Sequence, residues 1–282
     1  GHRPRLAANH DGVALAAGGE VGLQCECGDG LTGGQVGQDL GVGVMGGDQR
    51  TGDRRRHVRT GNGPIAEFGD RDSGFQQTEA LPADRLGQVQ TVQTLLAGGV
   101  KRVVVVVGHD AGPVAAVVGR LGRGRVRAVY ADRWRDGNGA SLAAADGAVA
   151  GETLFALLTA DHVFGDGAID RLLATGAPAA LVDPTPDRDA WLEGTRVRVV
   201  DGAVVAFGKH LGEPAIDCGA FLLPPDIFRS QAQAAADGDH TLAGAVTRLA
   251  QERPLRAVAL PGGCWWRDVD TPEDARAAAA AL

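Results

Sequence analysis

Two groups of aspartates have the types and spacing that suit a metal ion and phosphate groups. Asp161 follows the apolar run at residues 154–160, where a carboxylate is costly unless it is solvated or paired. Asp268 and Asp270 form a D-x-D pair, which places two carboxylates on one side of an extended segment. Mg²⁺ is typically held by one or two carboxylates together with substrate phosphates. We therefore predict Asp161 as a metal ligand, with Asp268 or Asp270 as the second. The alternatives are that Asp161 caps a turn and that Asp270 assists the start of the next helix.

A glycine-rich segment at residues 137–141 has the composition of a nucleotide-binding loop. Gly137 and Gly139 would permit close approach of the backbone to a ligand. Asn138 and Ser141 carry polar groups that can contact the edge of a base or a ribose. The competing interpretation is a turn followed by a helix cap, and the motif alone favours neither one.

Gly108 and His109 follow a run of valines and open a predicted helix, which is a position suited to anions. We predict that both face the nucleotide, although a packing or helix-entry role would also account for His109. The glycines here do not form G-x-G-x-x-G, so the dinucleotide fingerprint is absent. Lys101 and Lys209 are the only lysines of the chain. A lysine kept at position 209 suggests a compact ammonium that contacts a phosphate, while a solvated surface lysine is the alternative.

The composition excludes several classes of protein. The chain has 282 residues, 44% of them hydrophobic, and a formal net charge of -7, which argues against general nucleic-acid binding. It has neither an apolar run of membrane-spanning length nor a signal peptide, so we expect no membrane insertion and a cytoplasmic location. Four cysteines are too few and too scattered for a disulfide framework.

Strand and helix patterns alternate from residue 86 to the end. Strands are predicted at residues 103–107, 126–131, 154–160, 179–182, 216–223 and 255–260, with helices between most of them. Residues 197–207 read as a hairpin that turns at Asp201-Gly202, and Thr271, Pro272 and Asp274 form the start of a well-capped last helix. This alternation predicts an α/β domain with a Rossmann-like mixed, mainly parallel sheet flanked by helices.

The first 85 residues have a different composition. They are rich in Gly, Arg, Asp and Gln and lack helical or strand periodicity. Such a composition buries too little apolar surface to offset chain entropy. We therefore divide the chain into an atypical segment, 1–85, and a domain, 86–282.

The predicted domain resembles the sugar-phosphate nucleotidyltransferase superfamily, and within it the inositol-1-phosphate and phosphocholine cytidylyltransferases. Any one matching motif is weak, but six occur in the family's order. They are residues 99–109, 134–142, 159–164, 208–211, 216–221 and 266–274.

The resemblance implies a GT-A-like fold and transfer of a nucleoside monophosphate, CMP in the most similar branch, to a phosphorylated alcohol or sugar. The acceptor phosphate would attack the α-phosphate of the triphosphate in line, and pyrophosphate would leave. Asp161, with Asp268 or Asp270, would hold Mg²⁺. Residues 137–141 would lie against the base and ribose. Lys209 would contact the acceptor phosphate, and Asp217 would face the acceptor's head group.

One part of the family pattern is missing. The family begins with a strand and a glycine-rich loop that contains an essential Arg followed by Pro-Lys, and this chain has no Pro-Lys. Either residues 1–85 are a divergent extension of an impaired enzyme, or they are a wrong-frame translation, the hypothesis that we favour. A nucleotide-binding domain without activity and a nucleotide-sugar glycosyltransferase are the alternative functions. The position of the D-x-D pair near the C-terminus argues against the glycosyltransferase.

Overall fold

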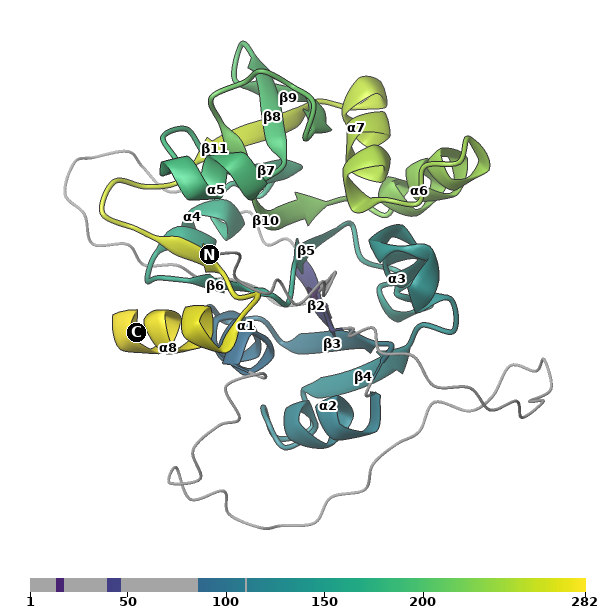
Figure 1. Cartoon of the computed structure of the whole chain (residues 1–282). Helices are drawn as coiled ribbons and strands as arrows, with labels where there is room; N and C mark the ends of the chain where they lie inside the picture. Colours follow the sequence, from purple (N-terminus) through teal and green to yellow (C-terminus); the bar gives the residue numbers. More distant parts are fainter. Residues whose placement is uncertain (1–13, 18–39, 47–85, 110) are drawn as a thin grey trace, which may run out of the picture.

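The computed structural model describes residues 14–17, 40–46, 86–109 and 111–282 (Figure 1). The strands are β1 (Ala14–Ala17), β2 (Leu40–Gly46), β3 (Arg102–Val107), β4 (Val126–Tyr130), β5 (Leu154–Leu158), β6 (His162–Phe164), β7 (Ala179–Asp183), β8 (Arg196–Val200), β9 (Ala203–Gly208), β10 (Ile216–Leu223), β11 (Leu255–Ala259) and β12 (Trp266–Asp268). The α-helices are α1 (Leu86–Ala97), α2 (Ala111–Val118), α3 (Asn138–Ala144), α4 (Ala168–Leu173), α5 (Arg188–Glu193), α6 (Asp226–Ala236), α7 (Leu242–Glu252) and α8 (Pro272–Ala281).

One mixed sheet forms the centre of the described residues, in the order β4-β3-β1-β2-β5-β10-β7-β11-β9-β8. The pairs β3–β4, β2–β3, β2–β5 and β7–β11 are parallel. The strand β10 runs antiparallel between β5 and β7, so the strands on its two sides point the same way. Most strands thus share one direction, which confirms the predicted mixed, mainly parallel sheet.

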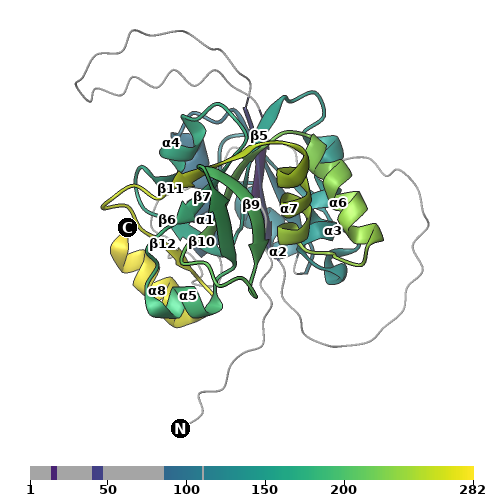
Figure 2. The same cartoon turned by 90° about the horizontal axis from the view of Figure 1, so that it is seen from above.

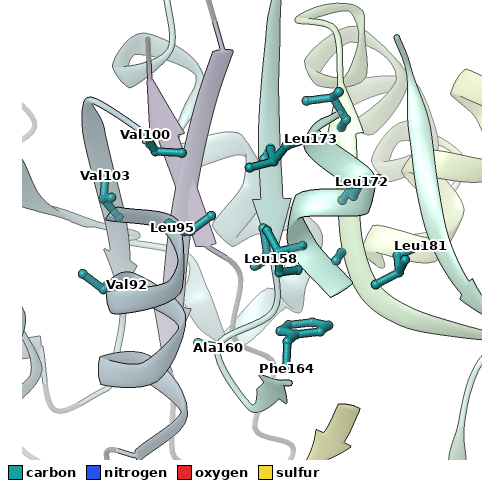
Figure 3. Packing of buried hydrophobic residues seen from close by; sticks show 14 of the residues in the cluster. Val92, Leu95, Val100, Val103, Leu158, Ala160, Phe164, Leu172, Leu173 and Leu181 are labelled. Carbon is teal, nitrogen blue, oxygen red and sulfur yellow. The ribbon is translucent and has the colours of Figure 1, made fainter. Parts of the chain in front are cut away.

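The sheet is covered by helices on both faces, because successive side chains of a strand point to opposite faces. The valines of β3 show this: Val103 and Val105 pack in one apolar cluster, and Val104 and Val106 in the other. Residues of α1, α2 and α4 complete the first cluster, and Figure 3 shows Leu95, Leu158 and Leu172 converging there. Residues of α3, α6 and α7 complete the second. The result is a three-layer α/β/α domain (Figure 2).

Local signals in the sequence account for two of the element boundaries. Asp201 and Gly202 both adopt positive φ, 49° and 76°, as a tight two-residue hairpin turn between β8 and β9 requires. Thr271 accepts a hydrogen bond from the backbone N–H of Asp274, whose carboxylate accepts one from the backbone N–H of Thr271. This reciprocal pair confirms the predicted capping box at the start of α8.

Five of the strands and α-helices were not predicted: β1, β2, β6, β12 and α5. The strands β6 and β12 form a separate two-stranded antiparallel sheet (Figure 2). Each has three residues, which is too short for a hydrophobic period to show in the sequence. Their pairing matters for function because it brings the C-terminal segment against the chain that leaves β5.

The first 85 residues contribute β1 and β2, which lie in the sheet between β3 and β5. The division of the chain at residue 86 stays a prediction. Among the helices of the described residues, none combines the length and the apolar character that a membrane crossing needs.

Candidate functional site

Asp161 lies just beyond the carboxyl end of β5, at the edge of the sheet where ligands bind in open α/β folds. Backbone hydrogen bonds hold this turn from two directions. The N–H of Thr159 donates to the carbonyl of Gly219 (2.9 Å), and the carbonyl of Asp161 accepts from the N–H of Val269 (2.8 Å). The second bond ties the turn to the residue that follows β12. Residues more than a hundred positions apart are thereby held side by side.

Strand pairing then sets which side chains meet. In the register of β6 with β12, His162 lies opposite Asp268. The imidazole Nε2 of His162 is 3.9 Å from Oδ1 of Asp161 and 4.0 Å from Oδ1 of Asp268. One ligand atom from each of these three residues lies within 4.8 Å of the other two. Two aspartates predicted as metal ligands are therefore brought together, and His162 joins them.

The carboxylate of Asp161 is poorly compensated in its surroundings. Its Oδ1 atom is buried and makes no hydrogen bond. Burial raises the pKa of Asp161 to about 7, an effect that His162 opposes and that the nearby Asp268 reinforces. An orphaned carboxylate oxygen facing a second carboxylate fits a divalent cation, because the cation would supply the missing charge.

His162 is held in a fixed orientation. Its Nδ1 lies 2.7 Å from the backbone carbonyl of Cys218, and its ring centroid is 4.9 Å from that of Trp266. Gly219 has a φ of +69°, and a Cβ there would stand 2.4 Å from Nδ1 of His162. A side chain at position 219 would therefore push the ring away. Burial lowers the pKa of His162, but Asp161, Asp268 and Asp217 together raise it above its usual value.

Asp217 lies near the same edge, close enough for its charge to influence His162. It stands near the start of β10, and its Oδ1 accepts a hydrogen bond from the N–H of Gly219 (2.7 Å). Burial raises the pKa of Asp217 to about 6, and this hydrogen bond and His162 limit the rise. The role that the resemblance implies for Asp217, beside the head group of the acceptor, stays a prediction.

Asp270 follows Asp268 by two residues, in the segment that leads into α8. The ligand-forming group described above contains Asp268 and not Asp270. The register of β12 explains the choice, because Asp268 is the residue paired with His162. A role for Asp270 in metal binding stays a prediction.

The predicted nucleotide loop at residues 137–141 makes mainly structural contacts. The side-chain oxygen of Asn138 accepts from the N–H of Leu242 (2.6 Å), and the N–H of Gly139 donates to the carbonyl of His240 (2.9 Å). A Cβ on Gly139 would stand 2.6 Å from that carbonyl oxygen, and one on Gly137 would stand 2.8 Å from it. Ser141 is buried in α3. These contacts dock α3 against the start of α7, and a role of the loop toward a nucleotide stays a prediction.

The remaining predicted residues lie in two other places. Gly108 follows β3 and is buried, and a Cβ there would stand 2.5 Å from the ring of Trp134, while the rings of His109 and Trp134 lie 5.5 Å apart. Lys209 is exposed after β9, and its backbone carbonyl accepts from Arg196 (2.9 Å). Their predicted roles toward the nucleotide and the acceptor stay predictions.

Comparisons with known proteins agree with the resemblance seen in the sequence. The chain is 34% identical over 234 residues to the "Bifunctional IPC transferase and DIPP synthase" of Rubrobacter xylanophilus, a match covering 79% of this chain and 52% of that protein. It is 31% identical over 195 residues to the protein of that name from Thermococcus kodakarensis, covering 67% of this chain and 42% of that one. Both matches agree with the predicted resemblance to the sugar-phosphate nucleotidyltransferase superfamily.

Solved structures of this superfamily share the fold. The inositol-1-phosphate CTP transferase from T. maritima matches with a TM-score of 0.56 and 19% identity, covering 67% of this chain and 78% of that one. A UTP-bound UGPase from Acinetobacter baumannii matches with a TM-score of 0.55 and 15% identity, covering 71% of this chain and 81% of that one. Both support the predicted nucleotidyltransferase fold.

The relatives also show how far the likeness extends. The chain spans about half the length, or less, of the curated relatives it matches. The 79% share of this chain in the Rubrobacter match exceeds what residues 86–282 alone could supply, so that match reaches into the first 85 residues. No family model matches the chain.

His162 is the residue of this site that the sequence did not single out as a ligand. It follows Asp161 directly, and the pair Asp161-His162 was visible as a polar cluster at a strand end. The sequence could not show that β12 pairs with β6 and places Asp268 opposite His162.

Proposed function

We propose that this chain transfers a nucleoside monophosphate, CMP, from a nucleoside triphosphate to a phosphorylated alcohol or sugar, with release of pyrophosphate. The observation that carries the proposal is the buried, unpartnered Oδ1 of Asp161, which faces the carboxylate of Asp268 across the β6–β12 pair. The likeness to the IPC transferases supports the proposal, because phosphoryl chemistry depends mainly on positioning and charge neutralisation.

A divalent cation, Mg²⁺ in the first instance, fits between these two carboxylates. Asp161 and Asp268 would hold it, and it would neutralise negative charge on the phosphates of the triphosphate. The chain's own residues supply the geometry: the Val269–Asp161 and Thr159–Gly219 backbone bonds fix where the Asp161 carboxylate stands. The edge of the sheet beyond β5 is thereby preorganised for phosphates.

The two substrates would lie on opposite sides of the metal. We assign the base and ribose to the side of β3 and α3, where Gly108, His109 and residues 137–141 lie. We assign the acceptor to the side of β9 and β10, where Asp217 is buried and Lys209 is exposed. An ammonium at position 209 would neutralise the acceptor phosphate before it attacks. The names of the relatives make inositol phosphate the first acceptor to test and CTP the first nucleotide.

The direct test is pyrophosphate release by the full chain with each of the four nucleoside triphosphates, Mg²⁺ and a panel of phosphorylated alcohols and sugars. The proposal expects release that requires CTP and one class of acceptor. Nucleotide binding without release for any pair would contradict the transferase and favour a binding domain. That second function is kept in view by the absence of the family's Pro-Lys motif.

A further inference from the structure

His162 has a second feature beyond its nearness to two carboxylates, which is a fixed protonation pattern. A carbonyl oxygen only accepts hydrogen bonds, so the 2.7 Å contact with Cys218 requires the hydrogen to be on Nδ1 of His162. In the neutral imidazole Nε2 then carries the lone pair. That atom is the one lying 3.9 Å and 4.0 Å from the carboxylate oxygens of Asp161 and Asp268.

The residues around the imidazole of His162 hold it with Nδ1 toward the carbonyl of Cys218 and Nε2 toward the carboxylates. A Cβ at position 219 would collide with Nδ1, so only glycine lets the backbone carbonyl at 218 stand against the imidazole. Trp266 packs against the ring from β12, the strand that also presents Asp268. A histidine whose far nitrogen donates to a carbonyl is the usual arrangement of a metal-ligating histidine.

The distances suit a shared ion. Two atoms that each lie about 2.1 Å from one metal ion are at most about 4.2 Å apart. Both separations from Nε2 fall within this limit. All three ligand atoms lie within 4.8 Å of one another, so small side-chain movements would close the group around an ion.

We propose that Nε2 of His162 is the third protein ligand of the cation, beside Asp161 and Asp268. The inference rests on the proposed function only in placing a cation between the two carboxylates, and it states which cation is preferred. Carboxylates suit Mg²⁺ and Mn²⁺, whereas imidazole suits later transition metals. A site with one nitrogen and two carboxylates binds Mn²⁺ and Co²⁺ more tightly than Mg²⁺.

The test measures coordination directly and needs neither nucleotide nor turnover. Mn²⁺ is added to the full chain, and coupling of the electron spin to a ¹⁴N nucleus is recorded by pulsed electron paramagnetic resonance. We expect ¹⁴N coupling in the wild-type chain that changes to ¹⁵N coupling when histidine is labelled with ¹⁵N. In His162→Gln the histidine coupling disappears and the dissociation constant for Mn²⁺ rises roughly tenfold or more. The control His240→Gln changes an exposed histidine and keeps both properties.

Several results would overturn the inference. Bound Mn²⁺ without histidine coupling in the wild-type chain would show a site made of oxygen ligands alone, as would unchanged Mn²⁺ affinity in His162→Gln. Failure of the wild-type chain to bind Mn²⁺ would also reject it. Isotope labelling keeps the test decisive if His162→Gln does not fold. Pyrophosphate release with Mg²⁺ separates this outcome from the proposed function: release without histidine coupling rejects the nitrogen ligand alone, and coupling without release rejects the transferase alone.

Discussion

Two polar regions at the edge of the sheet differ in how completely their polar atoms are used by the fold. At residues 137–141, Asn138 and Gly139 already bond to the backbone at Leu242 and His240. At the turn after β5, Asp161 keeps a buried oxygen with no hydrogen bond and sits near another carboxylate. The first region stabilises the fold as it stands. In the second region the buried carboxylate of Asp161 lowers the stability of the fold, and a bound cation would restore that stability.

The contrast shows that residue types which suggest one role in the sequence can have another role in the fold. A glycine-rich loop with Asn and Ser has the composition of a ligand site, and here Asn138 and Gly139 also dock α3 on the start of α7. An Asp at a strand end has the composition of a cap, yet here its carboxylate is unsatisfied. Substitutions in the two regions should therefore affect different properties of the chain.

The largest expected effect is on catalysis, from Asp161→Asn. Removing this charge should lower the rate of pyrophosphate release about 10²–10³-fold, since one preorganised charged group at a transition state contributes that much. The fold should not suffer, because Asn carries no charge to bury. The rate and the thermal unfolding curve are measured together. Asp189→Asn, on the first turn of α5, is the matched control and should keep full activity. Equal rates for the two variants would remove Asp161 from the site.

The second expected effect is on stability, from Gly139→Ala. A Cβ would stand 2.6 Å from the carbonyl oxygen of His240, which is backbone and yields little. We expect a loss of about 1–3 kcal/mol in the free energy of unfolding, measured by urea denaturation. Gly147→Ala is the control, since a Cβ there meets nothing within 4 Å. A variant of normal stability would contradict the packing role that these contacts give to the loop.

These two regions also show how much the sequence could predict. The valine run of β3 and the capping box of α8 are local signals, and the structure has both elements where the sequence placed them. The pairing of β6 with β12 depends on contacts between residues more than a hundred positions apart, which no local pattern contains. Asp161 and Asp268 could be predicted from local patterns, a strand end and a D-x-D pair. His162 could not, because only the pairing of β6 with β12 brings it against Asp268.

The same limit explains the loop at residues 137–141. Its composition left two interpretations open, and the packing partner that the structure shows, the start of α7, lies about a hundred residues further on. The sequence thus indicates the chemistry of single residues, but it does not indicate which distant residues they contact.

The third expected effect is on the pH dependence of stability. Asp161 has its pKa raised from 3.8 to about 7 by burial, so the folded chain binds a proton that the unfolded chain has released. Stability contributed by the protonated form is present below about pH 4 and is lost as pH rises toward 7. We expect the metal-free chain to lose on the order of 2 kcal/mol over this interval, and Asp161→Asn to lose less. Denaturation at pH 5 and pH 7.5 measures the difference; equal slopes for the two chains would contradict the assignment.

The smallest expected effect comes from Lys209→Gln. Lys209 is exposed, so its loss should leave the unfolding temperature unchanged. If its ammonium contacts the acceptor phosphate, the KM for the acceptor should rise roughly tenfold, equivalent to about 1.4 kcal/mol, while the KM for CTP stays constant. Lys101→Gln, the change of the other lysine, is the control and should alter neither constant. A rise in the KM for CTP alone would move Lys209 to the nucleotide side.

The measurement that tests the central claim most directly is the unfolding temperature of the wild-type chain and of Asp161→Asn, each with and without Mg²⁺ and CTP. The account predicts that the ligands raise the unfolding temperature of the wild-type chain by several degrees and leave that of Asp161→Asn nearly unchanged, since a ligand stabilises only the state that binds it. Equal ligand-induced shifts in the two chains would contradict it, because the nucleotide and its metal would then bind without Asp161.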